Sequence, residues 1–564
     1  MIMAQTLPAA ELIVHSGEVL ASDGAAQASA VAIAGGRILA VGGAELLQFA
    51  EAGTILIDAA GGAILPGIND GHLHFVASAV AEFGTVKIGA EVAGDWAAVV
   101  DILRAESPGE DGWIRAHGWD EVVLGEGGPD ALFELHPDAP MVAYDQTGHQ
   151  LLVNRKAADL AGLEGKVAKG TTGGVVGTNG DGTANGKLTD AAMELLSPVI
   201  PPLPAALLRS SLLAYQAKLH AWGITSLTEP GLGPGGMGLF GGACATAGLQ
   251  ALADLAASGE LSLRVNALLL FTGTGGATAK AVAEGLASVL PGSLEDRGID
   301  ADTLRIAGVK VFADGTPRSG TAWMSEPYET PCGLDHGAMV IAGATDAERE
   351  AELRAIVAAI HGAGLQAGIH ATGDATTAAA VEAIAAAQAA DQRDARHYII
   401  HGSFADAQAL ADLAKHGIGY STNPAIRAGA GALMRRVLGA DRFAKHQPLA
   451  SALAAGIRTN IASDAPVTSP DWRETVIAAV TRDSSAGPGA ADDPERVPLE
   501  AAIDMMTSHP AWQDHATGRK GRIAAGYLAD LCVMEQPLDP DVGHLRGNQV
   551  KATIAHGRIV HRLD

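Results

Sequence analysis

The chain has 564 residues, of which 48% are hydrophobic and 18% charged, a composition typical of globular proteins with more than one domain. Its formal net charge of -26 argues against a nucleic-acid or anionic-membrane partner, because like charges repel. No apolar run reaches the length of about 18 residues that a membrane span needs, and residues 1–20 lack a signal-peptide pattern. Cys244, Cys332 and Cys532 are widely spaced and odd in number, so we expect a cytoplasmic protein without disulfides.

The two ends of the chain share one pattern, in which short apolar runs are separated by glycine turns. Near the start, two such runs meet at Gly35-Gly36, which predicts a β-hairpin because adjacent glycines favour tight hairpin turns. The strand-like runs cover residues 11–17, 31–34, 37–42, 521–523, 529–534 and 551–560. We expect both ends to form one composite β-sandwich, made of residues 1–64 and 519–564.

One stretch joins a strand-like run to a pair of histidines. Residues 63–65 are apolar, as in a buried strand, and residues 66–74 follow with the sequence PGINDGHLH. Side chains alternate along a strand, so His72 and His74 would point to the same side and could bind one metal ion. A bare pair of this kind could equally be hydrogen-bonded surface histidines, but the surrounding sequence favours the metal site.

Between the β-rich ends, strand-like and helix-like segments alternate, which is typical of an α/β domain with parallel strands. Alanine-rich segments such as 346–362 and 375–390 have the composition of helices. After the run that leads into the histidine pair, the expected strands are 223–228, 263–270, 306–312, 366–370, 398–401, 417–421 and 458–464. Eight such strands predict a (β/α)8 TIM-type barrel, which we place at residues 65–84 plus 206–518.

The first two expected strands are separated by far more residues than one crossover needs. Residues 85–205 contain helical and glycine-rich hairpin patterns of their own, which predicts an inserted subdomain after barrel strand 1. Loops that follow barrel strands shape the substrate pocket in this architecture. We therefore expect the insert to lie near the mouth of the active site.

Four further strands carry residues that can bind metals. The fourth, fifth, sixth and eighth expected strands contain or end in Lys310, His370, His401 and Asp464, respectively. Functional side chains of a TIM-type barrel gather at the carboxyl ends of the strands. If the strand assignments hold, these four side chains would surround one site together with the histidine pair.

Six segments carry recognisable motifs: residues 66–74 (PGINDGHLH), 147–154 (TGHQLLVN), 309–317 (VKVFADGTP), 369–374 (IHATGD), 463–467 (SDAPV) and 520–531 (KGRIAAGYLADL). With these motifs the chain resembles the metal-dependent amidohydrolase superfamily over nearly its whole length. Within it, the chain looks like the amidohydrolase family 3 branch, which contains N-substituted formamide deformylases. The resemblance implies a (β/α)8 barrel with a flanking β-sandwich, in agreement with the strand pattern.

The resemblance also implies a set of metal ligands: His72, His74, Lys310, His370, His401 and Asp464. The first two would bind the more buried ion, and the last two histidines a second ion. Lys310 matches a lysine that binuclear members carboxylate to a bridging carbamate, which suits divalent cations where an ammonium would repel them. The alternative is an unmodified Lys310 that acts as a charge for substrate. Asp464 would bind metal and act as the general base.

The activity that the resemblance implies is hydrolysis of a non-peptide C–N bond, in an amide, N-formyl or N-acyl group, by metal-bound hydroxide. One or two divalent ions are expected, with zinc as the default for histidine and carboxylate ligands and manganese or iron as alternatives. An esterase or lactonase, a cyclic amidase and a non-catalytic ligand-binding barrel remain alternative functions. A small-molecule substrate is the expected partner, and the family suggests a homodimer.

Four other residues are weaker candidates for substrate contact. His149 and Asn154 fall in a segment that resembles one reaching the active site, although a structural role is the alternative for both. Asp314 could orient Lys310 or the substrate, or form a turn. Trp119 could wall the pocket, or be buried next to a helix cap.

Two loops depart from the pattern of the branch. Residues 402–404 after the sixth strand read GSF, where relatives commonly continue with polar residues. Residues 423–427 after the seventh strand read NPAIR and lack a histidine that many relatives place there. Both loops would face the substrate, so the departures leave substrate identity open.

Overall fold

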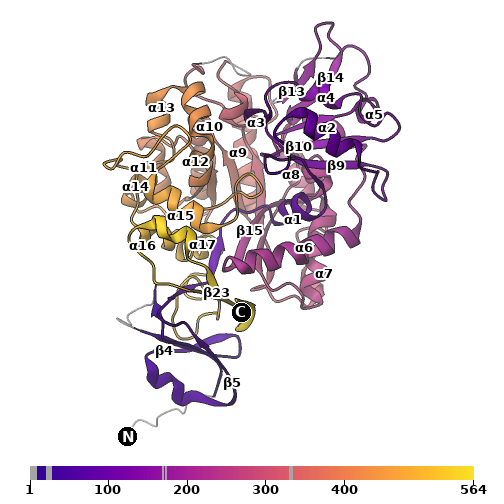
Figure 1. Cartoon of the computed structure of the whole chain (residues 1–564). Helices are drawn as coiled ribbons and strands as arrows, with labels where there is room; N and C mark the ends of the chain where they lie inside the picture. Colours follow the sequence, from indigo (N-terminus) through magenta and orange to yellow (C-terminus); the bar gives the residue numbers. More distant parts are fainter. Residues whose placement is uncertain (1–8, 21–27, 168–169, 172–173, 330–334, 564) are drawn as a thin grey trace.

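The computed structural model describes residues 9–20, 28–167, 170–171, 174–329 and 335–563. A barrel with surrounding helices forms the largest part of the molecule (Figure 1). A region built on two smaller sheets lies below it and contains strands from near both ends of the described chain, and a third region packs beside its upper end.

The barrel is built on one sheet of eight parallel strands in chain order. They are β7 (Ile68–Asp70), β15 (Ile224–Leu232), β16 (Arg264–Leu269), β17 (Leu304–Phe312), β18 (Gln366–Ala371), β19 (Tyr398–His401), β20 (Gly419–Thr422) and β21 (Thr459–Ile461). Most of their residues are buried, as expected for strands enclosed by helices. The sheet is nearly closed and fits a TIM-type barrel, as predicted.

Helices alternate with these strands and cover the outside of the barrel (Figure 1). The main ones are α1 (Phe75–Phe83), α6 (Ala205–Ala221), α7 (Thr246–Ala257), α8 (Ala279–Leu286), α9 (Asp346–Gly362), α10 (Asp374–Ala390), α11 (Ala407–His416), α12 (Pro424–Leu438), α14 (Leu449–Ala454) and α15 (Trp472–Thr481). The two alanine-rich segments predicted as helices form α9 and α10. Thr345 and Glu348 form a capping box that fixes the start of α9.

The predicted first strand is wrong in one respect. The apolar run at residues 63–65 lies in β6 (Ala63–Pro66), which pairs with β2 (Glu18–Val19) and β22 (Leu531–Met534) in a different sheet. The barrel strand β7 begins only after Gly67. A Cβ atom at Gly67 would lie 2.1 Å from the Thr225 hydroxyl, so only glycine lets the chain pass this close to β15 between the two sheets.

Both ends of the chain contribute to two sheets below the barrel. One has the order β4-β3-β1-β5 and the other β2-β6-β22-β23-β24. Their remaining strands are β1 (Ala10–His15), β3 (Ala30–Ala34), β4 (Arg37–Gly42), β5 (Ala50–Asp58), β23 (Val550–Ala555) and β24 (Arg558–Arg562). Val14, Ile33, Ile64 and Val533 belong to one buried apolar cluster, so the two sheets share a core.

The hairpin predicted at Gly35-Gly36 is confirmed. Strands β3 and β4 pair antiparallel, and the φ angles of Gly35 and Gly36 are 57° and 70°. Two consecutive positive φ angles are favourable only for residues such as glycine. The strand-like run at residues 521–523 forms no strand.

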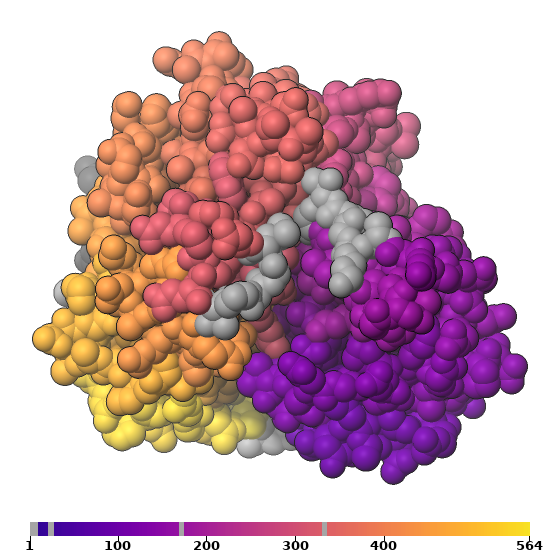
Figure 2. All heavy atoms as spheres, turned by 90° about the horizontal axis from the view of Figure 1, so that it is seen from above, coloured from indigo at the N-terminus to yellow at the C-terminus, as the bar shows by residue number. Residues whose placement is uncertain are grey.

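A third region follows α1 and carries a seven-stranded sheet of its own, in the order β12-β13-β14-β11-β10-β9-β8. Its strands are β8 (Val86–Lys87), β9 (Ile114–Trp119), β10 (Met141–Asp145), β11 (Gln150–Val153), β12 (Gly170–Thr171), β13 (Gly174–Thr178) and β14 (Ala184–Asp190). Its short helices are α2 (Trp96–Arg104), α3 (Glu121–Leu124), α4 (Gly128–Leu132) and α5 (Arg155–Leu160). Seen from above, this region, in indigo to purple, lies against the red and orange barrel segments (Figure 2).

The described part of the chain contains no helix that is both long and apolar enough to cross a membrane. Cys244 and Cys532 are buried and form no disulfide. Cys332 lies outside the described residues.

Candidate metal centre

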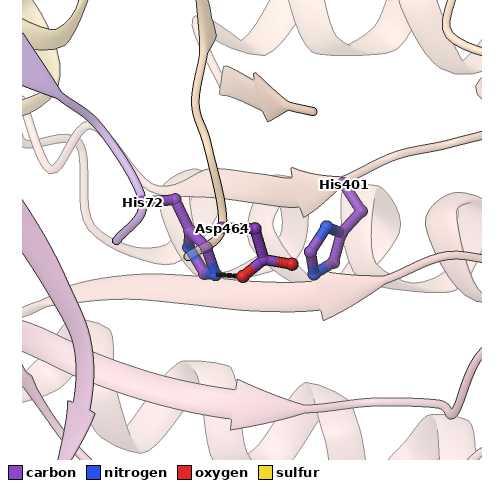
Figure 3. A group of neighbouring side chains, drawn as sticks. All are labelled: His72, His401 and Asp464. Atoms are coloured by element: carbon purple, nitrogen blue, oxygen red, sulfur yellow. Dashed lines mark ion pairs between the residues drawn. The ribbon is translucent and has the colours of Figure 1, made fainter. Parts of the chain in front are cut away.

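Three buried side chains from distant parts of the sequence converge at the carboxyl end of the barrel (Figure 3). His72 follows β7, His401 ends β19 and Asp464 follows β21. Their ligand atoms all lie within 4.8 Å of one another. This spacing suits a metal ion, since two imidazole nitrogens and a carboxylate oxygen are common ligands of zinc and related divalent ions.

His74 approaches the same carboxylate as His72. The Nε2 atoms of His72 and His74 lie 3.1 Å and 3.5 Å from Oδ1 of Asp464. The predicted reason for this convergence is wrong, because β7 ends at Asp70 and the histidines lie beyond the strand. Backbone hydrogen bonds position them instead: the N–H of Asp464 donates to the His72 carbonyl (2.9 Å), and the N–H of His74 donates to the Ala465 carbonyl (3.0 Å).

His370 and His401 form the other side of the site, with ring centroids 4.6 Å apart. The ring of His401 also lies 5.4 Å from the ring of His72. Nδ1 of His401 is 2.7 Å from Oδ1 of Asn423, which orients its ring. Nε2 of His370 lies 3.1 Å from the Gly315 carbonyl. The two histidine pairs are therefore joined through His401.

Lys310 lies in β17 with its side chain fully buried, and its ammonium nitrogen is 4.7 Å from the centroid of the Phe312 ring. Within the described residues its ammonium forms no ion pair. Burial lowers the pKa of Lys310 to about 7, because an ammonium loses its hydration there, although the charges of Asp464 and Glu229 act in the opposite direction. A deprotonated amine is the form that reacts with carbon dioxide, so this environment is compatible with a carbamate.

The electrostatics of the site keep its residues in the protonation states that bind metals. Burial holds the pKa of His72 and His370 well below its usual range and lowers that of His401 to about 4, so the imidazoles are neutral. For Asp464, burial alone would raise the pKa, but His72, His74 and His401 outweigh it and hold the pKa well below its usual range. Neutral imidazoles and an ionised carboxylate are the ligand forms.

Unsatisfied polar atoms provide a test of whether these residues fit a metal. Nδ1 of His72, Nδ1 of His74 and Oε1 of Glu229 are buried and lack a hydrogen-bond partner among the described residues. Buried polar atoms in folded proteins are normally satisfied, and leaving one unpaired costs about 1–3 kcal/mol. A cation beside His72 and Asp464 would satisfy such atoms, so the donor set fits a divalent metal.

Two of the weaker candidates, Asn154 and Trp119, lie away from the cavity and have the structural role that was their alternative. Asn154 is the N-cap of α5: its Oδ1 accepts from the backbone of Met141 and Ala157, and its Nδ2 donates to three carbonyls between residues 135 and 139. Trp119 is buried against Trp96, and its Nε1 donates to the Ala143 carbonyl (2.8 Å). Both side chains hold the seven-stranded region together and do not line the cavity described below.

Asp314 lies close to His370. The expected role, in which it orients Lys310, has no support in its contacts. Its carboxylate accepts hydrogen bonds from the backbone N–H groups of Thr372 (2.9 Å) and Gly373 (2.8 Å), just after β18. Oδ1 of Asp314 is also 3.6 Å from Nε2 of His370. Asp314 therefore fixes the loop that follows the strand of His370.

His149 lies beside the histidines of the barrel, with its ring centroid 5.8 Å from that of His370. Its Nδ1 is 2.8 Å from Oδ1 of buried Asp190, whose Oδ2 accepts from the Thr321 hydroxyl at 2.7 Å. Burial lowers the pKa of His149, but the hydrogen bond and charge of Asp190 outweigh it and raise the pKa overall. Sequence analysis missed Asp190, because the β11–β14 register that places it opposite His149 leaves no local sequence signal.

A cavity of about 320 Å³ opens beside these residues. His149, His370, His401 and Asp464 line its polar end. An apolar part of its lining comes from one face of α12, with Ala425, Ile426, Gly429, Ala430, Leu433 and Met434. Arg318 and Asp120 also line the cavity and form an ion pair that joins the barrel to the seven-stranded region.

Glu229 is a second residue that sequence analysis missed. It lies fully buried in β15, one residue beyond the predicted strand 223–228. Burial raises its pKa to about 8. The rule that selected Lys310 and His370, a polar residue at the carboxyl end of a barrel strand, would also have selected Glu229 had the strand been extended by one residue.

The comparisons with known proteins agree with this architecture. Protein LONG AFTER FAR-RED 3 of Arabidopsis thaliana is 26% identical over 536 residues, which cover 93% of this chain and 87% of that protein. The N-substituted formamide deformylase of Arthrobacter pascens is 36% identical over 155 residues, 27% of each chain. The crystal structure of an uncharacterized metal-dependent hydrolase from Pyrococcus furiosus is 23% identical, has a TM-score of 0.68 and aligns over 94% of this chain and 99% of its own, which shows the shared fold.

The sequence model of the amidohydrolase family matches residues 56–561, which include the barrel and the candidate metal centre. The resemblance predicted from the sequence motifs is therefore confirmed. The chain belongs to the amidohydrolase family and is a hydrolase that acts on carbon–nitrogen bonds.

Proposed function

We propose that this protein hydrolyses a non-peptide C–N bond in an amide, N-formyl or N-acyl compound with the help of one or two divalent metal ions. The convergence of His72, His401 and Asp464 within 4.8 Å carries this proposal, since it joins the ends of three barrel strands. The unpaired buried Nδ1 atoms of His72 and His74 support it further.

Six residues would hold the metal: His72, His74, Lys310, His370, His401 and Asp464. The first pair would bind the more buried ion and the last two histidines a second ion, with Lys310 as a bridging carbamate if two ions bind. Zinc is the default for this donor set. When bound, the metal lowers the pKa of a water molecule toward neutrality and polarises the substrate carbonyl.

Asp464 would move the proton in this reaction. Its carboxylate is ionised in the free protein, lies between His72 and His401 (Figure 3) and lines the cavity, where it can accept a proton from the attacking water. It would then pass this proton to the leaving amine nitrogen. The bond from the Asp464 N–H to the His72 carbonyl fixes its position relative to the histidine pair.

His149 would bind the substrate carbonyl oxygen. With Nδ1 bonded to Asp190, Nε2 is the ring nitrogen left for substrate, and the ring lines the cavity beside His370. A hydrogen-bond donor that faces the carbonyl oxygen stabilises the negative charge that develops on it during attack. Asp190, which raises the pKa of His149, would favour the imidazolium, in which Nδ1 donates to Asp190 and Nε2 donates to the substrate. The Thr321 hydroxyl holds Asp190 in place.

The shape of the cavity supports a substrate with an apolar part. The leaving group or acyl group would lie along the apolar face of α12, while the scissile bond lies at the polar end. The name of the Arthrobacter pascens relative identifies N-substituted formamides as the compounds on which that enzyme acts. We therefore propose N-substituted formamides and other small N-acyl compounds as the first substrates to test.

We also propose that residues 85–205 form the inserted subdomain that covers the cavity mouth, with 1–64 and 519–564 as a composite sandwich and 65–84 plus 206–518 as the catalytic barrel. Asp120 and Gln146 come from the insert and line the cavity, which supports this division. The paired Arg318 and Asp120 would hold the insert against the barrel.

Metal analysis combined with a substrate panel tests the function. Purified protein should contain one or two equivalents of divalent metal, and removal by a chelator should abolish hydrolysis of N-formyl and N-acyl amines. Zinc, manganese and iron are restored separately to identify the metal. Full activity of a His72→Ala variant that lacks metal would refute the mechanism. Preferential hydrolysis of esters or lactones would indicate the alternative activity at the same site. Metal binding without turnover of any substrate would indicate a ligand-binding barrel.

A further inference from the structure

Two unsatisfied atoms face each other beside the candidate metal centre. Oε1 of Glu229 lies 4.0 Å from Nδ1 of His74. Both atoms are buried, and neither has a hydrogen-bond partner among the described residues. Glu229 is 0% exposed, so water cannot replace the missing partner from bulk solvent. A shift of about 1 Å would bring the two atoms to hydrogen-bonding distance.

The two ring nitrogens of His74 have different surroundings. Nε2 lies 3.5 Å from Oδ1 of Asp464, on the side where the metal is proposed to bind. Nδ1 points to Glu229, which belongs to the neighbouring strand β15. A histidine that binds metal through one nitrogen carries a proton on the other, and this N–H usually donates to a carboxylate or carbonyl oxygen. Glu229 supplies such an oxygen.

Glu229 also contacts the helix that begins immediately after His74. Its Oε2 accepts from the N–H of Val76 (2.9 Å) in the first turn of α1, for which His74 is the N-cap without a side-chain hydrogen bond. The carboxylate therefore fixes the backbone beside His74 with one oxygen and leaves the other oxygen for its ring. The ring of Phe240, 6.4 Å from that of His74, adds an apolar contact.

We propose that Glu229 is a positioning residue for His74: it accepts the Nδ1–H of the imidazole and thereby directs Nε2 to the metal. The inference rests on the proposed function only in that His74 binds a metal ion. It assigns a role in metal affinity, which can be measured without any substrate.

A Glu229→Gln variant separates this role from the capping of α1. The introduced amide has the shape of the carboxylate, and its oxygen can still accept from the Val76 N–H. Its NH₂ group would then face His74 Nδ1 and could not accept a hydrogen bond from the Nδ1–H. We expect the variant to bind Zn²⁺ about 10–100-fold more weakly than the wild type, measured by competition with a chromophoric chelator.

Glu194→Gln is the matched control. Glu194 likewise accepts a backbone N–H, from Thr274 at 2.9 Å, and its second oxygen accepts from the Ser197 hydroxyl at 2.7 Å. None of the proposed metal ligands contacts Glu194, so its variant should bind Zn²⁺ as the wild type does. Thermal unfolding of the metal-free proteins reports whether either substitution disturbs the fold.

The outcomes are distinct. Weaker Zn²⁺ binding by Glu229→Gln, with wild-type binding by Glu194→Gln and unchanged unfolding of the metal-free chain, supports the positioning role. Unchanged Zn²⁺ binding by Glu229→Gln overturns it. A lower unfolding temperature of the metal-free Glu229→Gln chain that accounts for the weaker binding also overturns it, in favour of a helix cap. A wild-type chain that binds no Zn²⁺ refutes the proposed function itself.

Discussion

Two clusters of buried ionisable residues, one at each end of the barrel strands, are built differently. The first is the candidate metal centre at the carboxyl ends of the strands. The second, here called the amino-end cluster, lies near the strand starts and consists of Arg264, Asp514, Lys520 and Asp530. In it, Arg264 forms two bonds to Asp530 (2.6 and 3.0 Å), and Lys520 pairs with Asp514 at 2.7 Å. Each of its charges therefore has a partner of the opposite sign.

The two buried lysines show the contrast most clearly. Lys520 is 7% exposed and donates to Asp514 and to the Ser226 hydroxyl. Lys310 is 1% exposed and forms no ion pair among the described residues. Burial lowers the pKa of both, to about 7 for Lys310, while the charge of Asp514 opposes the shift at Lys520. A satisfied cluster serves the fold, whereas an unsatisfied one is retained despite its cost because a ligand completes it.

The largest expected effect is a loss of kcat/KM when the proposed base of the metal centre is replaced. Asp464→Asn removes the proposed base with little change in shape, and kcat/KM should fall by about 10³-fold or more on any substrate found in the panel. Steady-state kinetics with metal analysis of the same sample measure this loss. If the variant retained wild-type kcat/KM with its metal bound, Asp464 would not be the base.

The matching change in the amino-end cluster should affect stability instead. Asp530→Asn leaves Arg264 buried without its carboxylate, which costs about 3–5 kcal/mol of unfolding free energy. Urea denaturation of the metal-free chain measures the cost. The affinity of the folded variant for Zn²⁺ should stay at the wild-type value. A large change in this affinity would mean that the amino-end cluster also serves metal binding.

A smaller effect is expected where substrate meets the insert. His149→Asn should lower kcat about 10²-fold with little change in KM or metal content, because it removes a donor that acts mainly on the developing charge. Asp190→Asn should lower kcat less, since it weakens the orientation and protonation of His149 without removing its ring. A rise in KM with unchanged kcat would indicate that His149 binds the ground state alone.

The smallest expected effect is a change in the free energy of unfolding of the metal-free chain. Lys310 has a folded pKa of about 7 against the ordinary 10.5, so the unfolded chain binds an extra proton between these pH values. The resulting destabilisation is complete below pH 7 and disappears as the pH rises to 10.5. In CO₂-free buffer at pH 7, Lys310→Met should therefore stabilise the metal-free chain, on the order of 2 kcal/mol.

The same variant has a pH signature that distinguishes it from simple core packing. The difference in unfolding free energy between the variant and the wild type, measured by urea denaturation, should shrink between pH 7 and pH 10. In this range the buried lysine of the wild type ceases to destabilise the folded chain. A constant advantage would mean that the gain comes from packing. No advantage at pH 7 would mean that the ammonium of Lys310 is well solvated or paired in solution.

Much of the barrel and the family could be predicted because their signals are local. Eight apolar runs with intervening helices indicate parallel strands, and parallel strands align their carboxyl ends, so Lys310, His370 and His401 could be expected at one edge. The same reasoning failed for residues 63–65, because an apolar run does not reveal which of two sheets it joins. For Asn154 and Trp119 the sequence left a structural role open, and their side chains satisfy backbone groups in the seven-stranded region.

The sequence by itself determined the order of the elements, the family and the candidate ligands, because periodicity and motif spacing are properties of the chain. Only the tertiary structure decided which polar groups face each other. Asp190 meets His149 through antiparallel strand register, and Glu229 meets His74 across two neighbouring barrel strands. Such pairs depend on sheet register and on the few ångströms between side chains, which sequence separation does not encode.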